Sequence, residues 1–173
     1  MECQEYSKGS VSSLICSIFS LGKITSESII SFEQRITFLA SEYLVQNFFI
    51  TLESCYLEYL DKLRLLQNVY NKETKITLIT HFPEETDWAN AISVENFPPC
   101  SNIENIDTKA KDIRTQNIRV IKMLIERSDF CICNLDETIF YGRIRKYVRQ
   151  SKKAKILDLG RPYRKPIFSM AEL

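Results

Sequence analysis

Short apolar runs alternate five times with segments of helical period, and this alternation constrains the fold more than any other feature of the sequence. The runs are continuous apolar stretches, which are typical of strands buried on both faces of a parallel sheet. We expect these strands at 12–19, 48–52, 75–80, 130–134 and 155–159. Apolar side chains recur at helical spacing between them, and we expect helices from Ser26 to about 44, and at 54–70, 112–127 and 138–151.

Strands that alternate with helices predict a sheet covered by helices on both faces, connected by right-handed crossovers. We therefore expect an α/β fold: a three-layer, Rossmann-like sandwich with a mainly parallel sheet of about five strands. A length of 173 residues suits a single domain over 1–173, with residues 160–173 as a surface tail. Residues 81–111 interrupt this alternation of strands and helices, and we interpret them as a long excursion with one short helix.

Composition excludes several classes of protein. Hydrophobic residues make up 45% and charged residues 26%, which argues against disorder, and the net charge is only +1. No apolar run approaches the roughly 18 residues that span a bilayer, and the first residues lack the pattern of a signal peptide, so we expect a cytoplasmic protein without membrane contact. The six cysteines form no CxxC pair, so we expect reduced thiols, no metal site and no cofactor.

A ligand site is expected beyond the carboxyl ends of the strands, at the point where the strand order reverses. We place that point between the first strand and the strand at 130–134. The first turn offers Gly22, Lys23 and Thr25, which could meet a phosphate together with the next helix N-terminus. The alternative is an ordinary turn between a strand and a helix.

A second group of polar residues follows the strand at 130–134. Asn134, Asp136 and Thr138 could hydrogen-bond a ribose or a base. The alternative is that Asp136 caps the next helix and Glu137 stabilises its first turn.

The excursion carries the only histidine. His81 precedes several acids, including Glu85, and Trp88 follows them. A base or a metal ligand would need a second ligand or a nucleophile nearby, and the sequence shows neither. We expect solvated charges here, with Trp88 at the edge of a core, and we predict no catalytic residue.

The C-terminal part is basic. Ten basic residues lie between Arg143 and Lys165 against one acid, Asp158, with Tyr147 and Tyr163 among them. Such a stripe could follow a phosphate backbone. We interpret it instead as the solvated face of the last helix and do not expect nucleic acid as a partner.

One stretch resembles a known family. The segment RVIKMLIERSDFCIC, residues 119–133, resembles the SLOG superfamily, Rossmann-like nucleotide-sensor domains related to the LOG phosphoribohydrolases and to DprA. The matching positions are Leu124, Ile125, Glu126, Ser128 and Asp129, and Arg119 lies about one position from the family's helix arginine. KITLITHFPEETDWA, residues 75–89, is similar to the family's third strand and the loop that follows it.

The resemblance implies a nucleotide-derived ligand, and it adds Ser54 and Arg119 to the candidate contacts, Arg119 as a phosphate partner. Two departures bear on the phosphate site. The residues around Ser54 replace a glycine-rich turn, and Asp136-Glu137 replaces paired glycines before Thr138. Both departures put side chains where backbone would approach a phosphate.

Three functional hypotheses follow. The first is a non-catalytic domain that binds or senses a nucleotide derivative through a degenerate phosphate site. The second is a protein-interaction scaffold with a dead pocket, in bacterial or phage defence or regulation, for which a protein partner or a homo-oligomer is expected. The third is a nucleotide N-glycosidic hydrolase with His81 or Glu85 as base, but the hydrolases' Gly-Gly signature is missing.

Overall fold

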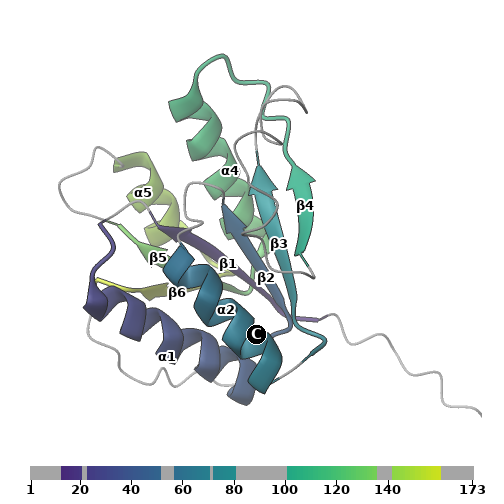
Figure 1. The fold of residues 1–173 in the computed structure, drawn as a ribbon. Coiled ribbons are helices and arrows are strands. Elements are labelled where there is room, and N and C mark those ends of the chain that lie inside the picture. The colour runs from purple at the N-terminus through teal and green to yellow at the C-terminus, as the bar shows by residue number, and fades with distance from the viewer. Residues whose placement is uncertain are drawn as a thin grey trace, which may run out of the picture.

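The computed structural model describes residues 13–20, 23–51, 57–70, 72–80, 101–135 and 142–160. These residues form a six-stranded, entirely parallel sheet in the order β4-β3-β2-β1-β5-β6 (Figure 1). The elements are β1 (Ile15–Ser20), α1 (Ser26–Glu42), β2 (Asn47–Thr51), α2 (Leu57–Val69), β3 (Lys75–Thr80), β4 (Ser101–Asn105), α4 (Ile113–Arg127), β5 (Phe130–Asn134), α5 (Gly142–Gln150) and β6 (Lys155–Asp158). The expected α/β Rossmann-like fold is confirmed.

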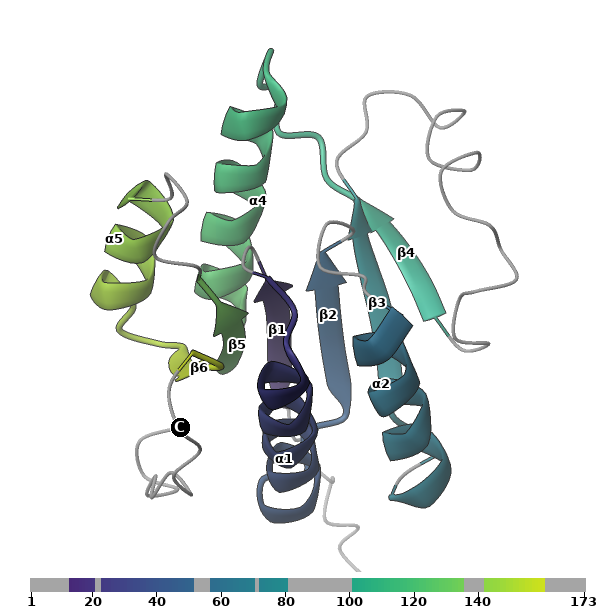
Figure 2. The same ribbon diagram turned by 60° about the vertical axis from the view of Figure 1, so that its left-hand side comes forward.

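Helices cover both faces of the sheet (Figures 1 and 2). α1 and α2 pack together on one face, over a core that includes Phe32, Tyr59 and Phe48. α4 and α5 pack together on the other face, where Ile121 and Ile144 share a second cluster with residues of β1 and β5. Because both faces are covered, the central strands β1 and β5 are buried along nearly their whole length, which explains their continuous apolar sequence.

The structure corrects the interpretation of residues 81–111 in part. Ser101–Asn105 is a strand, β4, which pairs in parallel with β3 at the edge of the sheet. Its sequence, SNIEN, holds a single apolar residue, Ile103, so no apolar run marks it. An edge strand has only one hydrogen-bonded neighbour and here is specified by that neighbour, not by its own hydrophobicity.

Two helices begin with a side-chain cap. Thr25 is the N-cap of α1, and its side chain accepts from Ser28 N–H at 3.1 Å while Thr25 N–H donates to Ser28 Oγ at 2.9 Å. Asp112 caps α4 by accepting from Thr115 N–H at 2.8 Å. That hydrogen bond lowers the pKa of Asp112, because it favours the charged carboxylate.

The amino ends of the central strands are joined by the residues that carry the family resemblance. The Ser128 hydroxyl donates to Leu124 O at 2.6 Å and lies 2.5 Å from Ser17 Oγ. The Asp129 carboxylate accepts from Ile15 N–H at 2.9 Å. The matching Ser-Asp pair therefore ends α4 and anchors β1, which is a structural role.

An ion pair joins the C-terminal end of α4 to the edge strand β4. Arg127, at the end of α4, forms a two-pronged ion pair with Glu104 of β4, with nitrogen–oxygen distances of 2.6 and 3.3 Å. Its guanidinium carbon also lies 5.2 Å from the ring centroid of Phe49. These contacts attach the edge strand to the helix that crosses behind it.

The cysteines that the structure describes, Cys16, Cys131 and Cys133, are buried thiols that pack as small apolar residues. Among the described helices, none combines the length and the apolar character needed to cross a bilayer.

Candidate functional site

Every strand of the sheet ends in a residue with a hydrogen-bonding side chain. The last residues are Ser20 in β1, Thr51 in β2, Thr80 in β3, Asn105 in β4, Asn134 in β5 and Asp158 in β6. Because the strands are parallel, their carboxyl ends, and with them these side chains, lie along one side of the sheet. We call this row of strand ends the carboxyl edge, as distinct from the edge strands β4 and β6. Ligands of open α/β sheets bind outside this edge.

The strand order reverses between β1 and β5, where the sequence places the switch point. There Ser20 and Asn134 are register partners, and both side chains are buried. They follow Ile18 and Ile132 by two residues, so by the alternation of a strand they point toward the face that α1 covers.

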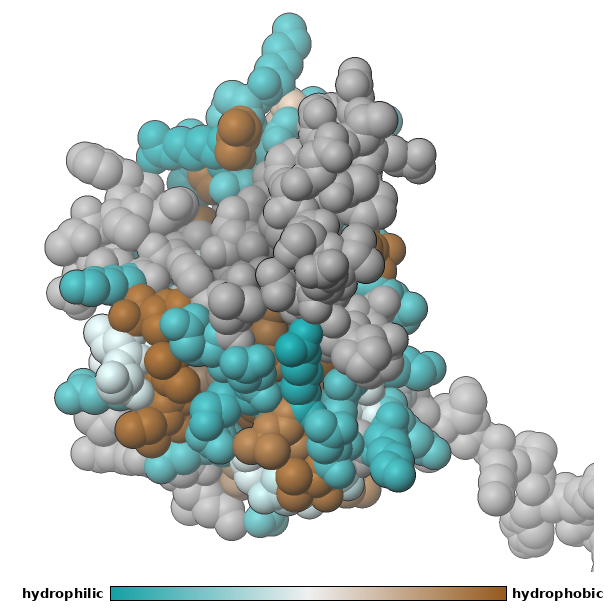
Figure 3. Space-filling view, viewed as in Figure 1, coloured by the Kyte–Doolittle hydropathy of each residue, from teal (hydrophilic) through white to brown (hydrophobic). Residues whose placement is uncertain are grey.

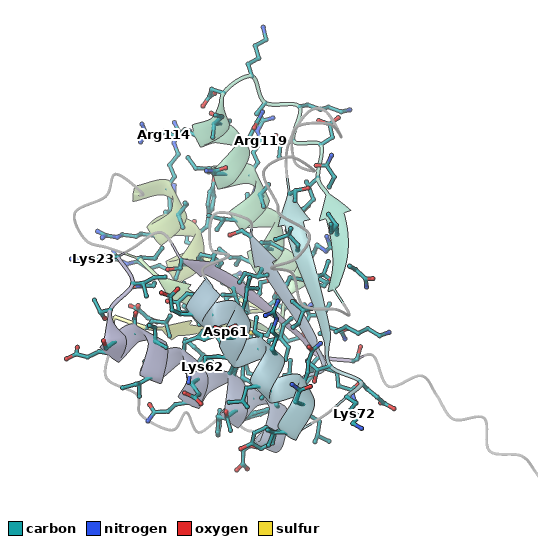
Figure 4. The ribbon with its side chains drawn as sticks, viewed as in Figure 1. Lys23, Asp61, Lys62, Lys72, Arg114 and Arg119 are labelled. Atoms are coloured by element: carbon teal, nitrogen blue, oxygen red, sulfur yellow. The ribbon has the colours of Figure 1, made fainter. Side chains whose placement is uncertain are left out.

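The two loops at the switch point are linked by a hydrogen bond. The Asn134 side-chain amide donates to Lys23 O at 3.2 Å, which holds the segment before α1 against the end of β5. The Lys23 side chain is exposed, and Figure 4 shows it projecting beside the start of α1. The structure therefore brings together two candidates that are 111 positions apart in the sequence.

Thr25 belongs to the same group by position, since it begins α1 at this edge. Its hydroxyl, however, already accepts from the Ser28 N–H, and Glu27 places a carboxylate in the first turn. The capping box uses N–H groups that a phosphate would otherwise meet, and the acid offsets the helix dipole. This helix start is therefore a weaker anion site than a bare glycine-rich turn.

Arg119 is not part of this group. It is an exposed side chain of α4, and it donates to Thr108 O at 2.6 Å, in the segment between β4 and α4. In Figure 4, Arg119 and Lys23 lie at clearly separate places on the molecule. The role of Arg119 in these contacts is to hold the chain that leads into α4.

The remaining sequence candidates lie outside the described residues. They are Gly22, Ser54, Asp136 and Thr138 among the ligand contacts, and His81, Glu85 and Trp88 in the excursion. Three of the eight expected ligand residues, Lys23, Thr25 and Asn134, are thus described and lie together.

Sequence reasoning missed part of the carboxyl edge. Ser20, Thr51 and Thr80 are buried ends of central strands, and the Thr80 hydroxyl lies 3.4 Å from the Asn105 side-chain oxygen. A polar residue at the end of an apolar run is the available signal, but the expected carboxyl ends of β1 and β2 differ from the observed ones by one residue. The burial of these hydroxyls could be recognised only with the neighbouring strands in place.

A buried cation was also missed. Arg35 of α1 is 4% exposed and donates to Asp158 O at 2.8 Å and to Ser31. The guanidinium thereby ties the middle of α1 to the end of β6. In sequence it looks like one more polar position of an amphipathic helix.

The thiols of Cys16 and Cys131, near the centre of the sheet, are unreactive because they stay protonated. Burial raises the pKa of Cys131 to about 12 and raises that of Cys16 well above its usual range. Thiols that stay protonated are poor nucleophiles and poor metal ligands. Among the described residues, no cluster of three His, Cys, Asp or Glu side chains could hold a metal ion.

Comparison with known proteins assigns no family. No protein-family model matches the chain, and a search of curated proteins finds no match.

Proposed function

We propose that the carboxyl edge between β1 and β5 binds a nucleotide-derived small molecule without transforming it. The observation that carries this proposal is the Asn134–Lys23 hydrogen bond, which joins two polar segments at the point where the strand order reverses. Folds of this type bind ligands at that point. The resemblance of residues 119–133 to nucleotide-sensor domains is in keeping with such a ligand.

The available groups suit recognition better than reaction. Between β1 and β5, the described part of this edge offers the Ser20 and Thr25 hydroxyls, the Asn134 amide and the Lys23 ammonium, which can hydrogen-bond a ribose or a base and neutralise one phosphate charge. Catalysis by a nucleophile needs an adjacent base, and these groups do not supply one. The occupied cap of α1 and Glu27 favour a ligand held mainly through its sugar and base.

Thermal-shift measurements with nucleotides and cyclic ADP-ribose-like compounds test this function. A ligand at one hundred times its Kd should add about 2.7 kcal/mol of stability. For a chain of this size, that corresponds to a rise in Tm of about 5–11 °C. Lys23→Ala should diminish the rise, because it removes the cation at the switch point.

Lys72→Ala is the matched control. Lys72 is an exposed lysine in the turn before β3, at the opposite end of the strands from Lys23 (Figure 4). Its removal should leave the ligand-induced rise unchanged. No rise with any compound, or equal losses in the two variants, would contradict the proposal.

A protein-interaction scaffold is the second candidate. Exposed apolar side chains on the α1/α2 layer favour it: Ile30, Leu65 and Val69 are 57%, 48% and 64% exposed. Apolar groups are visible among polar ones over this layer in Figure 3. A Leu65→Ser/Val69→Ser variant should abolish any concentration-dependent self-association measured by sedimentation. If no small molecule raises Tm and the parent chain self-associates, the scaffold is the better description.

A further inference from the structure

The two helical halves of the molecule differ sharply in charge. In residues 13–80, the described lysines and arginines number six and the described acids also six, so their charges cancel. In described residues 101–160 there are thirteen lysines and arginines against six acids, an excess of seven positive charges. The described residues therefore carry a net charge of +7, and the overall charge of +1 means that the rest of the sequence carries a net −6.

The excess is greatest on α5. This helix of nine residues carries Arg143, Arg145, Lys146 and Arg149 and no acid. Its apolar side packs onto α4 through Ile144, which is fully buried. The side chains of Arg143, Lys146 and Arg149 are exposed, and their spacing of three residues aligns them on one outward stripe.

The acids near this stripe already have partners. Glu126 lies 3.7 Å from Lys122, and Asp129 lies 3.5 Å from Lys153. No carboxylate of the described segments pairs with Arg143, Lys146 or Arg149. The stripe is therefore not neutralised by the part of the fold on which it rests.

Folding alone does not account for these charges. Like charges three or four positions apart repel each other along a helix. Cations in the first turn also oppose the helix dipole, and α5 has Arg143 and Arg145 there with no acid. Ile144 packs α5 onto α4, and the outward cations Arg143, Lys146 and Arg149 take no part in that packing, so these three weaken the helix and point to an external anion.

We propose that the outward stripe of α5, together with the exposed Lys152 that follows the helix, binds the phosphate backbone of a nucleic acid duplex. Arg143 to Arg149 cover about 9 Å of helix axis, which matches about three steps of 3.4 Å along one DNA strand. Arginine also suits phosphate, because its planar fork donates two hydrogen bonds at once. From sequence alone we expect a solvated face; the structure adds that no acid of the described segments pairs with Arg143, Lys146 or Arg149.

Other anionic partners fit the surface less well. Helices that bind membranes at the interface insert large apolar side chains. The exposed large apolar residues that the structure describes lie elsewhere, and none is on α5. Single strands are bound through exposed aromatic rings. Tyr147 is half-buried, and the Lys122 ammonium lies 5.5 Å from its ring centroid.

Fluorescence anisotropy with a labelled 20-base-pair duplex of mixed sequence tests the proposal. With four phosphate contacts, from Arg143, Lys146, Arg149 and Lys152, the affinity should fall about 150-fold between 50 and 200 mM salt. An R143Q/K146Q/R149Q variant keeps one contact, so it should bind more weakly and lose only about threefold over the same range. Its Tm should equal or exceed that of the parent, because repulsion along α5 is relieved.

K72Q/K75Q is the control, since it removes two exposed lysines from the neutral half. This variant should bind the duplex as the parent does. The proposal is overturned if the parent does not bind the duplex at 50 mM salt, or if the triple variant binds with an unchanged salt dependence. Binding to vesicles with anionic lipid but not to the duplex would overturn it in favour of a membrane surface. Lys23→Ala should leave duplex binding intact, which separates this test from that of the small-molecule site.

Discussion

The two edges of the sheet use polar side chains differently. At the amino edge, Ser17, Ser128 and Asp129 form short hydrogen bonds, of 2.5 to 2.9 Å, within buried or largely buried surroundings. At the carboxyl edge, the bond from Asn134 to Lys23 O is 3.2 Å long and reaches a segment whose lysine side chain is exposed. The bonds at the amino edge tie α4 and β5 to β1, whereas the bond between β5 and the segment before α1 at the carboxyl edge leaves the Lys23 side chain in solvent.

This difference changes the meaning of the family resemblance. Ser128 and Asp129, two of the residues on which the expected resemblance rests, act at the amino edge, and the candidate ligand residues lie at the other end of the strands. In this structure their contacts join α4 to β5 and β1. These contacts carry information about the fold and leave the ligand to be tested separately.

Substitution of Asp129 is the strongest test of the difference between the amino and carboxyl edges. Asp129→Ala leaves the partly buried Ile15 N–H without its acceptor, and we expect a loss of about 2 kcal/mol in the free energy of unfolding. Asp129→Asn keeps one acceptor and should lose less. Urea denaturation measures both variants, and a loss below about 0.5 kcal/mol for the alanine variant would contradict a structural role, since that is the range of neutral surface changes.

The amino edge should also be sensitive to alkali. Cys131 is the register partner of Ser17, and burial raises its pKa from 9.0 to about 12. The unfolded chain releases this proton above about pH 9 while the folded chain retains it, so its contribution to stability is complete below pH 9 and declines as the pH rises toward 12. The decline should be about 1.4 kcal/mol per pH unit within that window. Denaturation of parent and Cys131→Ala between pH 8 and 11 should show a shallower slope for the variant; equal slopes would count against it.

A double-mutant cycle sharpens the description of the buried serine pair. Ser17→Ala or Ser128→Ala alone leaves the other hydroxyl without this partner in a buried site. We expect the double variant to be more stable than the sum of the single losses predicts, by about 1 kcal/mol. Strict additivity in urea denaturation would show that the two hydroxyls do not depend on each other.

The carboxyl edge should respond least. Asn134→Ala removes one hydrogen bond to the carbonyl of Lys23, whose surroundings are open to water, so we expect a loss below about 1 kcal/mol. Hydrogen exchange of the Lys23–Thr25 backbone should accelerate while that of β1 does not. A global loss as large as that of Asp129→Ala would remove the distinction between the edges.

Much of the fold was predictable from local pattern. The strands at 75–80 and 130–134 have the expected bounds, because each is an apolar run flanked by polar residues. α4 begins after the expected Asp112 and ends at Arg127. β4 escaped prediction because its SNIEN sequence carries no strand pattern of its own.

The candidate site was predictable in position but only partly in composition. The switch point follows from the order of elements, and it selected Lys23, Thr25 and Asn134 correctly as neighbours. Arg119 was placed there by resemblance, yet its guanidinium contacts Thr108. The direction in which a long side chain points depends on packing that sequence spacing does not describe.

By itself, the sequence determined the alternation of strands and helices and hence a parallel sheet between two helical layers. Continuous apolar runs mark the strands and an apolar period of 3.6 residues marks the helices, and both patterns lie within short stretches of the sequence. Only the tertiary structure decided that SNIEN completes the sheet beside β3 and that Arg35 of α1 holds the end of β6. These features depend on contacts between residues far apart in the chain, such as the 123 positions that separate Arg35 from Asp158.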